Sequence, residues 1–80
     1  MTLEQFIEDF ASQLDNTDLS EITAETKFKE LEEWSSVDAL LIIVMADEKY
    51  HARINRDDII NSQTIKDLFE RVKLKYDSSQ

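Results

Sequence analysis

The sequence contains no cysteine, no glycine and no proline among its 80 residues. Without cysteine, the chain can form no disulfide and has no thiol to act as a nucleophile or a zinc ligand. Without glycine, it has none of the glycine-rich loops that bind phosphate groups. The lack of glycine also disfavours an all-β fold, because tight hairpins favour glycine in their turns. These absences favour a helical domain without catalytic loops of this kind.

Basic residues are scarce as well. The chain has 9 Lys and Arg against 18 Asp and Glu, so its net charge is −9. Such a chain should repel nucleic acid and anionic membrane surfaces, because Lys and Arg provide most of the attraction to both. The excess of acidic residues lies in residues 1–38, where only Lys27 and Lys29 are basic, while residues 39–80 carry no net charge. We therefore expect basic protein surfaces to be the partners, approaching the first half of the chain.

Long hydrophobic runs are missing too. The longest apolar run covers residues 39–46, which is much too short to span a bilayer. The first ten residues are acidic, whereas a secretory signal begins with a basic segment. We expect a single domain over residues 1–80, ordered over about 2–75, that is monomeric and located in the cytoplasm.

The spacing of apolar residues predicts an all-α fold with three longer helices, one short third helix and a long first loop. Residues 15–34 form this loop, which Ile22, Phe28 and Leu31 attach to the core, and residues 75–80 form a frayed tail. Pairs of a capping residue and a partner three positions later mark three of the helix starts. The expected helices cover residues 2–14, 36–50, 56–60 and 65–74, and the capping pairs are Thr2 with Gln5, Asn55 with Asp58 and Thr64 with Asp67.

The second helix is the most informative segment, because it is apolar almost all round. A helical wheel at about 100° per residue separates its two faces. One face is assigned to the core and contains Ala39, Ile42, Ile43, Ala46 and Tyr50, while Met45 is left unassigned. The opposite face forms an apolar patch with an acidic rim, which is typical of a binding surface, although it could also pack beneath the long loop. The patch contains Val37, Leu40, Leu41 and Val44, and the rim contains Asp38, Asp47 and Glu48.

The order of motifs from Phe28 onward resembles the acyl carrier protein family. In that family, a Phe in the first loop precedes an Asp-Ser-Leu motif that opens a largely apolar second helix with acidic residues. Here Phe28 precedes Trp34-Ser35-Ser36-Val37-Asp38 and then ALLIIVMADEKY, and TIKDLF resembles the family's T-x-x-D-L pattern at the fourth helix. The helix order and lengths also agree. The resemblance implies a four-helix acyl-carrier-like bundle in which Ser36 carries a 4′-phosphopantetheine arm donated by coenzyme A.

The same resemblance implies a carrier that is not itself an enzyme. The arm holds acyl groups as thioesters and presents them to fatty-acid or polyketide-type enzymes. The implied partners are a phosphopantetheinyl transferase and acyl-processing enzymes with basic docking surfaces, and the bound chain is shielded between the second, third and fourth helices. The apolar patch and its acidic rim are the implied docking residues. No metal site is expected.

The chain departs from the family pattern within the motif and beyond it, where His51, Arg53 and Arg56 add positive charge after the second helix. Ser35 replaces the Asp before the modified serine, Val37 replaces the usual Leu, and Leu41 stands where many members have an acid. Ser35 is also a good helix cap with Asp38 as its partner, so we place the arm on Ser36 and treat Ser35 as the second choice. Two alternative functions stay open: a peptidyl, aminoacyl or D-alanyl carrier with the same arm, and an unmodified helical adaptor that binds a basic partner through the patch.

Two single residues are given structural roles. We expect Trp34 to anchor the first loop against the start of the second helix. His51 lies at the end of that helix, where the helix dipole favours a cation, and no Ser-His-Asp or metal set is available for it to join.

Overall fold

The computed structural model describes residues 2–14, 22–32 and 34–78, and these ranges contain four α-helices and no strand. Three helices are longer and the third is short, which confirms the all-α prediction. The helices are α1 (Leu3–Ala11), α2 (Ser36–Tyr50), α3 (Arg56–Ile60) and α4 (Ile65–Ser78), and a 3₁₀ turn, η2, covers Phe28–Glu30 in the first loop. Part of the expected loop segment, residues 15–21 together with Glu33, lies outside the described ranges.

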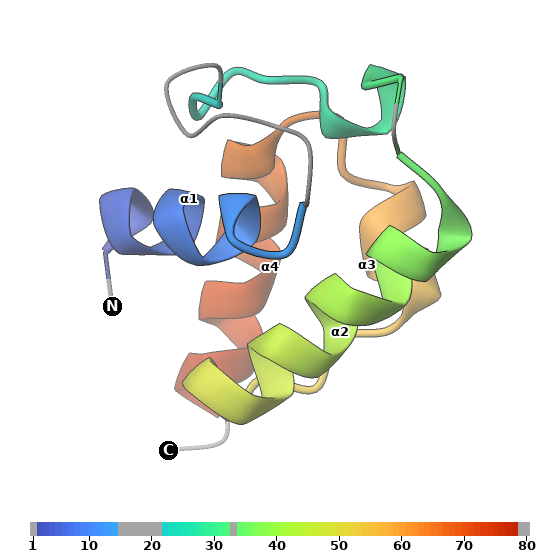
Figure 1. The fold of residues 1–80 in the computed structure, drawn as a ribbon. Coiled ribbons are helices and arrows are strands. Elements are labelled where there is room, and N and C mark those ends of the chain that lie inside the picture. Colours follow the sequence, from blue (N-terminus) through green and yellow to red (C-terminus); the bar gives the residue numbers. More distant parts are fainter. Residues whose placement is uncertain (1, 15–21, 33, 79–80) are drawn as a thin grey trace.

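The helices are arranged around a central pair formed by α2 and α4. Both α1 and α3 pack against each member of this pair. Figure 1 shows α1 and α3 on opposite sides of it, with the described part of the first loop above the bundle. None of the helices in the described ranges combines the length and the apolar character needed to cross a membrane.

The first helix is shorter than predicted. It ends at Ala11 rather than at residue 14, because the chain tightens there. The N–H groups of Gln13 and Leu14 donate to carbonyls only three residues earlier, at 3.1 and 3.0 Å. Thr2 caps the helix by accepting a hydrogen bond from the Gln5 N–H at 3.1 Å. The Gln5 side chain donates to Asp9 instead of returning to Thr2, so the predicted reciprocal capping pair is only half formed.

The fourth helix is longer than predicted, and the expected frayed tail is wrong for residues 75–78. The helix continues to Ser78 because its last turns contact the rest of the molecule. Lys75 forms an ion pair with Asp58 of α3, and Tyr76 packs against the core. The bounds of α2 and α3 agree with the predicted ranges.

Reciprocal caps open α3 and α4, as the sequence predicts. Asn55 and Asp58 exchange backbone-to-side-chain bonds of 3.0 Å in both directions. Thr64 and Asp67 do the same at 3.2 Å. Each pair satisfies N–H groups that a helix start leaves without an intrahelical partner.

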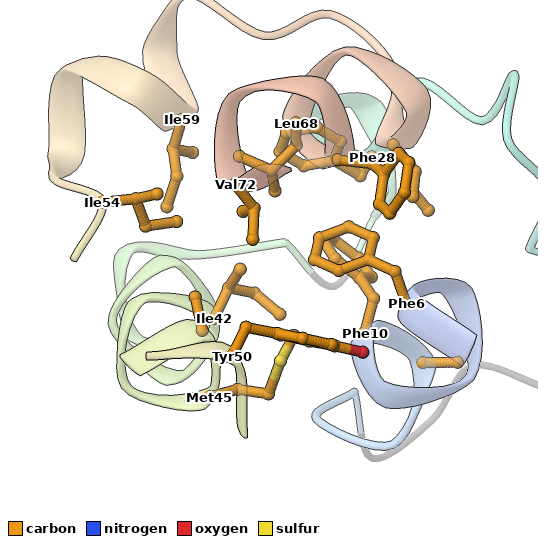
Figure 2. Close-up of a cluster of buried hydrophobic side chains, with 14 of the residues drawn as sticks. Phe6, Phe10, Phe28, Ile42, Met45, Tyr50, Ile54, Ile59, Leu68 and Val72 are labelled. Atoms are coloured by element: carbon orange, nitrogen blue, oxygen red, sulfur yellow. The ribbon is translucent and has the colours of Figure 1, made fainter. Parts of the chain in front are cut away.

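The hydrophobic core has an aromatic part and an aliphatic part (Figure 2). Phe6, Phe10 and Phe28 lie toward α1 and the first loop, while Ile54 and Ile59 lie at the opposite end, beside Ile42 and Val72. Met45, which the helical wheel left unassigned, is buried in this core, and Ile43, which it placed there, is only partly buried. The other four predicted core residues of α2 are buried: Ala39, Ile42, Ala46 and Tyr50.

The first loop is attached to the bundle by side chains and by backbone bonds. Ile22 and Phe28 are buried and Leu31 packs against the core, as predicted. The N–H groups of Ile65 and Lys66, in the first turn of α4, donate to the carbonyls of Thr26 and Ala24 at 3.1 and 3.0 Å. The loop thus supplies the acceptors that the start of α4 requires.

Candidate modification site and docking face

The segment that leads into α2 is held by Trp34. Its ring stacks on Phe10 with a centroid distance of 6.0 Å and an interplanar angle of 5°, and meets Phe28 edge-on at 5.1 Å. Aromatic pairs in these arrangements add stability beyond the area that they bury. Trp34 thereby anchors the first loop, as predicted, although its main ring partners come from α1 and η2 rather than from the start of α2.

Ser35 is the residue that caps α2. Its backbone is extended, and both its N–H and its hydroxyl donate to the Asp38 carboxylate, at 3.0 and 3.2 Å. The Ser35 hydroxyl is therefore already used inside the protein. Both bonds of this cap join Ser35 to Asp38, so the cap makes no use of the Ser36 hydroxyl.

Ser36 is the first residue of α2 and is exposed. Within the described residues, its hydroxyl forms no hydrogen bond, ion pair or other contact of these kinds. The first turn of a helix offers N–H groups and the positive end of the helix dipole, both of which favour a covalently attached anion. Of the two serines, Ser36 alone has a hydroxyl that an external enzyme can use without breaking the cap.

The apolar patch lies on the solvent side of α2. The exposed fractions are 63% for Val37, 55% for Leu40, 39% for Leu41 and 48% for Val44. The four side chains do not pack beneath the described part of the first loop, which was the alternative interpretation. They form a continuous apolar face that starts one residue after Ser36, and large exposed apolar patches commonly mark interaction sites.

The acidic rim of the patch is uneven. Asp47 and Glu48 are exposed at the far end of α2, and neither forms an ion pair with any described residue. Asp38 is partly buried and accepts both bonds from Ser35. Asp38 thus belongs to the cap as well as to the rim, so the negative charge available to a partner is greatest at the C-terminal end of the face.

Sequence reasoning missed the buried carboxylate of Asp9. It accepts hydrogen bonds from the Tyr50 hydroxyl, from Lys49 Nζ at 3.3 Å and from Gln5 at 3.3 Å. Burial alone would raise the pKa of Asp9, but the bonds from Tyr50, Lys49 and Gln5 outweigh it and hold the pKa below its ordinary value. Burial and the neighbouring carboxylate raise the pKa of Tyr50. The only sequence signal was the position of Asp9 at the edge of the apolar stripe of α1.

Asp58 was recognised as a helix cap, but its second role was not. Its carboxylate also faces Arg71 Nη1 at 3.2 Å and Lys75 Nζ at 3.7 Å, both from α4. Burial would raise the pKa of Asp58, but the Asn55 N–H and the two cations lower it overall. Two buried acids therefore each connect a pair of helices: Asp9 connects α1 to α2, and Asp58 connects α3 to α4.

His51 ends α2 in a left-handed conformation, with φ 53° and ψ 33°. The sequence assigned it a role through its charge, but the structure shows that its backbone terminates the helix. The described residues contain no group of three or more His, Asp or Glu that could hold a metal ion.

Together these features define a class: a small all-helical domain with an accessible serine at the start of a helix and an apolar face beside it. In comparisons with known proteins, no protein-family model, no curated protein and no solved structure matches the chain.

Proposed function

We propose that this protein is an acyl carrier that holds acyl groups as thioesters on a 4′-phosphopantetheine arm attached to Ser36. The proposal depends most on one observation: the Ser36 hydroxyl is exposed and unused at the start of α2, while the neighbouring Ser35 hydroxyl is bonded to Asp38. Attachment at Ser36 leaves the cap of α2 intact. Attachment at Ser35 would remove the cap's hydroxyl donor.

The surroundings of Ser36 suit a phosphodiester. The helix that follows has 15 residues, so its N-terminal N–H groups and dipole favour a negative group there. The attachment forms a bond between Ser36 Oγ and the phosphorus that bears the pantetheine, and it breaks the phosphoanhydride bond of coenzyme A. Adenosine 3′,5′-bisphosphate is the leaving group, and the hydroxyl proton passes to a base of the transferase. The arm supplies the thiol that the chain lacks. The role of this chain is then to hold Ser36 in a fixed, accessible position through Trp34 and the cap.

The outer face of α2 supports docking to partner enzymes next to the arm. Val37, Leu40, Leu41 and Val44 offer an apolar contact, and Asp47 and Glu48 offer negative charge to basic groups of the partner. A phosphopantetheinyl transferase and acyl-processing enzymes with basic docking surfaces are the proposed partners. Because the patch begins directly after Ser36, docking would bring the arm to the partner's surface.

The core favours an acyl cargo over an aminoacyl, peptidyl or D-alanyl one. The proposed place for the cargo lies among α2, α3 and α4, where the buried side chains Ile42, Ile54, Ile59 and Val72 are aliphatic. Ser62 is also fully buried, but its hydroxyl donates to the Asp58 carbonyl at 2.7 Å. A charged amino group entering this region would find no free hydrogen-bond acceptor among these side chains and would be costly to bury.

The test is the intact mass of the chain after incubation with coenzyme A and a promiscuous phosphopantetheinyl transferase. We expect a gain of one phosphopantetheine in the wild type and in Ser35→Ala, and no gain in Ser36→Ala. A gain that persists in Ser36→Ala and disappears in Ser35→Ala would place the arm on Ser35. The absence of any gain with several transferases would contradict the carrier proposal.

The second candidate is an unmodified adaptor that binds a basic partner. The specific observation in its favour is the apolar patch itself, which is exposed whether or not Ser36 is modified. If modification fails, binding of the unmodified chain to a basic amphipathic helical peptide would support this function. Loss of that binding on substitution of Leu40 and Leu41 by Ser would assign it to the patch.

A further inference from the structure

The connection between α2 and α3 gathers positive charge in a chain that has little of it. His51, Arg53 and Arg56 lie within six residues, whereas the whole chain has only 9 Lys and Arg. All three side chains are exposed, and none of them forms a hydrogen bond or an ion pair with a described residue. The third arginine of the chain, Arg71, is instead paired with Asp58. We refer to His51, Arg53 and Arg56 together as the basic segment.

The backbone of this connection is held by the core and by the ends of both helices. Ala52 and Ile54 are buried, so the alternating residues His51 and Arg53 are turned to solvent. The N–H groups of His51 and Ala52 donate to carbonyls near the end of α2, both at 3.1 Å. The reciprocal cap of Asn55 fixes the start of α3. Because folding has already ordered this backbone, a partner does not have to order it on binding.

The basic segment is separated from the acidic half of the chain. Figure 1 shows the connection from α2 to α3 on the side of the bundle away from the described part of the first loop. That loop belongs to residues 1–38, which contain the excess of acidic residues. Glu48 and Asp57 flank the basic segment and are exposed, but neither forms an ion pair with a described residue. The two arginines are therefore available to a partner.

Carboxylates are well suited to bind these two arginines. A guanidinium group is planar, is charged at any physiological pH and can donate two parallel hydrogen bonds to one carboxylate. The Cα atoms of Arg53 and Arg56 are separated by no more than about 11 Å, which is the span of three fully extended residues. One short acidic segment can therefore contact both arginines, and the His51 ring offers it a further N–H donor.

A large polyanion fits this surface less well than a short acidic segment does. Nucleic acids and anionic membranes extend well beyond two arginine side chains, so they would also approach the rest of a molecule whose net charge is −9. That approach is repulsive, because most of the attraction to phosphate polyanions comes from many Lys and Arg side chains. A short acidic segment of a protein can contact the basic segment alone.

We infer that the basic segment is an interaction surface that binds an acidic segment of a partner protein. It differs from the proposed docking face of α2, whose acidic rim suits basic groups, and it requires neither Ser36 nor the apolar patch. A partner that contacts both surfaces must present basic groups to Asp47 and Glu48 and acidic groups to the arginines. A uniformly basic partner would be repelled at the basic segment, so this segment selects among partners.

NMR titration of the full, unmodified chain with a synthetic peptide tests this inference. The peptide has four consecutive glutamates flanked by alanines, and the ionic strength is low so that screening is weak. We expect the changes in backbone amide shifts to be concentrated in residues 51–56. In the double variant Arg53→Gln/Arg56→Gln, we expect the affinity to fall about fivefold to tenfold, because two charge-assisted contacts are lost. An unchanged amide spectrum outside residues 51–56 checks that this variant is folded.

The matched control is Lys66→Gln/Lys73→Gln, which removes two exposed cations from α4. Neither lysine forms an ion pair with a described residue, and this variant should bind the peptide as the wild type does. Equal weakening in both double variants would overturn the inference. It would also be overturned by the absence of binding, or by shift changes as large at Lys66 and Lys73 as in residues 51–56.

A DNA oligonucleotide with four phosphates provides the comparison with a phosphate polyanion. We expect it to bind more weakly than the peptide. Equal or tighter binding that is lost in Arg53→Gln/Arg56→Gln would assign the basic segment to phosphate groups and would overturn the inference. Failure of Ser36 modification would remove the carrier proposal but leave the peptide result standing, so the two failures are distinguishable.

Discussion

At the scale of single residues, His51 is notable because its backbone adopts the left-handed conformation. The residue is exposed and adopts φ 53° at the end of α2. The left-handed region costs a residue with a Cβ atom about 1–2 kcal/mol, whereas glycine enters it freely. In a sequence without glycine, histidine takes this position.

We expect His51→Gly to raise the free energy of unfolding by roughly 0.5 kcal/mol, after the greater entropy of glycine in the unfolded chain is subtracted. His51→Val should lower it by about 1 kcal/mol, because a β-branched residue is strained in this region. Urea denaturation measures both variants. A lower stability of His51→Gly would mean that the histidine side chain makes a stabilising contribution that outweighs its backbone strain.

Ser35 and Ser36 show how adjacent residues of one type take different roles. The Ser35 hydroxyl serves the cap of α2. The extended backbone at the capping position directs the side chain of that residue toward the first turn of the helix. The division of roles was predictable from sequence, because Asp38 stands three residues after Ser35. The accessibility of Ser36 required the structure, since exposure depends on which side chains the fold packs over the start of α2.

At the scale of secondary-structure elements, α2 carries two opposite apolar faces. The wheel assigned four of the five core residues and all four patch residues correctly, because a period of 3.6 holds over the 15 residues of the helix. Met45 escaped assignment because it lies at the boundary between the faces, where neighbouring helices decide which side chains are covered.

Substitution of Leu41, a residue of the patch, should change the binding of a partner enzyme without changing the folding of the domain. We expect Leu41→Glu to raise the KM of a phosphopantetheinyl transferase about threefold to tenfold, because a carboxylate placed in an apolar contact is costly to desolvate. The kcat should stay the same, and the unfolding free energy should change by no more than about 0.5 kcal/mol, as is usual for a surface position.

The control for this variant is Ile60→Glu, which places the same charge at an exposed apolar position on α3, outside the patch. It should leave KM unchanged. A lower KM in Leu41→Glu would show that the transferase meets this position with a basic group rather than an apolar one. Unfolding of Leu41→Glu would show that this leucine contributes to the core.

At the scale of the whole molecule, the two buried acids link stability to pH. Folding lowers the pKa of Asp9 and that of Asp58 from their ordinary values. A carboxyl group whose pKa is lowered by folding stabilises the protein fully above its unfolded pKa, and this contribution is lost as the pH falls through the folded value. The charged forms of both acids should therefore stabilise the protein from neutral pH down to about pH 4. At lower pH the free energy of unfolding should decrease.

Urea denaturation at pH values between 7 and 2.5 measures this dependence. In Asp9→Asn we expect lower stability at pH 7 and a smaller loss on acidification, because the group that faces Lys49, Tyr50 and Gln5 no longer titrates. An unchanged loss below pH 4 in Asp9→Asn would show that the Asp9 carboxylate does not contribute to acid sensitivity.

The sequence by itself determined the features that depend on neighbours along the chain. The helical class, the bounds of α2 and α3, and the caps at Asn55 and Thr64 follow from contacts three or four residues apart, which a one-dimensional pattern contains in full. The exposed patch follows from the same periodicity. The resemblance that leads to Ser36 also uses short local motifs.

Only the tertiary structure decided the features that depend on residues distant in sequence. The charge of Asp9 is stabilised by residues 40 and 41 positions away, and that of Asp58 by a residue 13 positions away. The extension of α4 past residue 74 depends on the same contact region, through Lys75 and Asp58. Whether a carboxylate can be buried depends on which donors the folded chain brings to it, and local periodicity carries no information about donors on other helices.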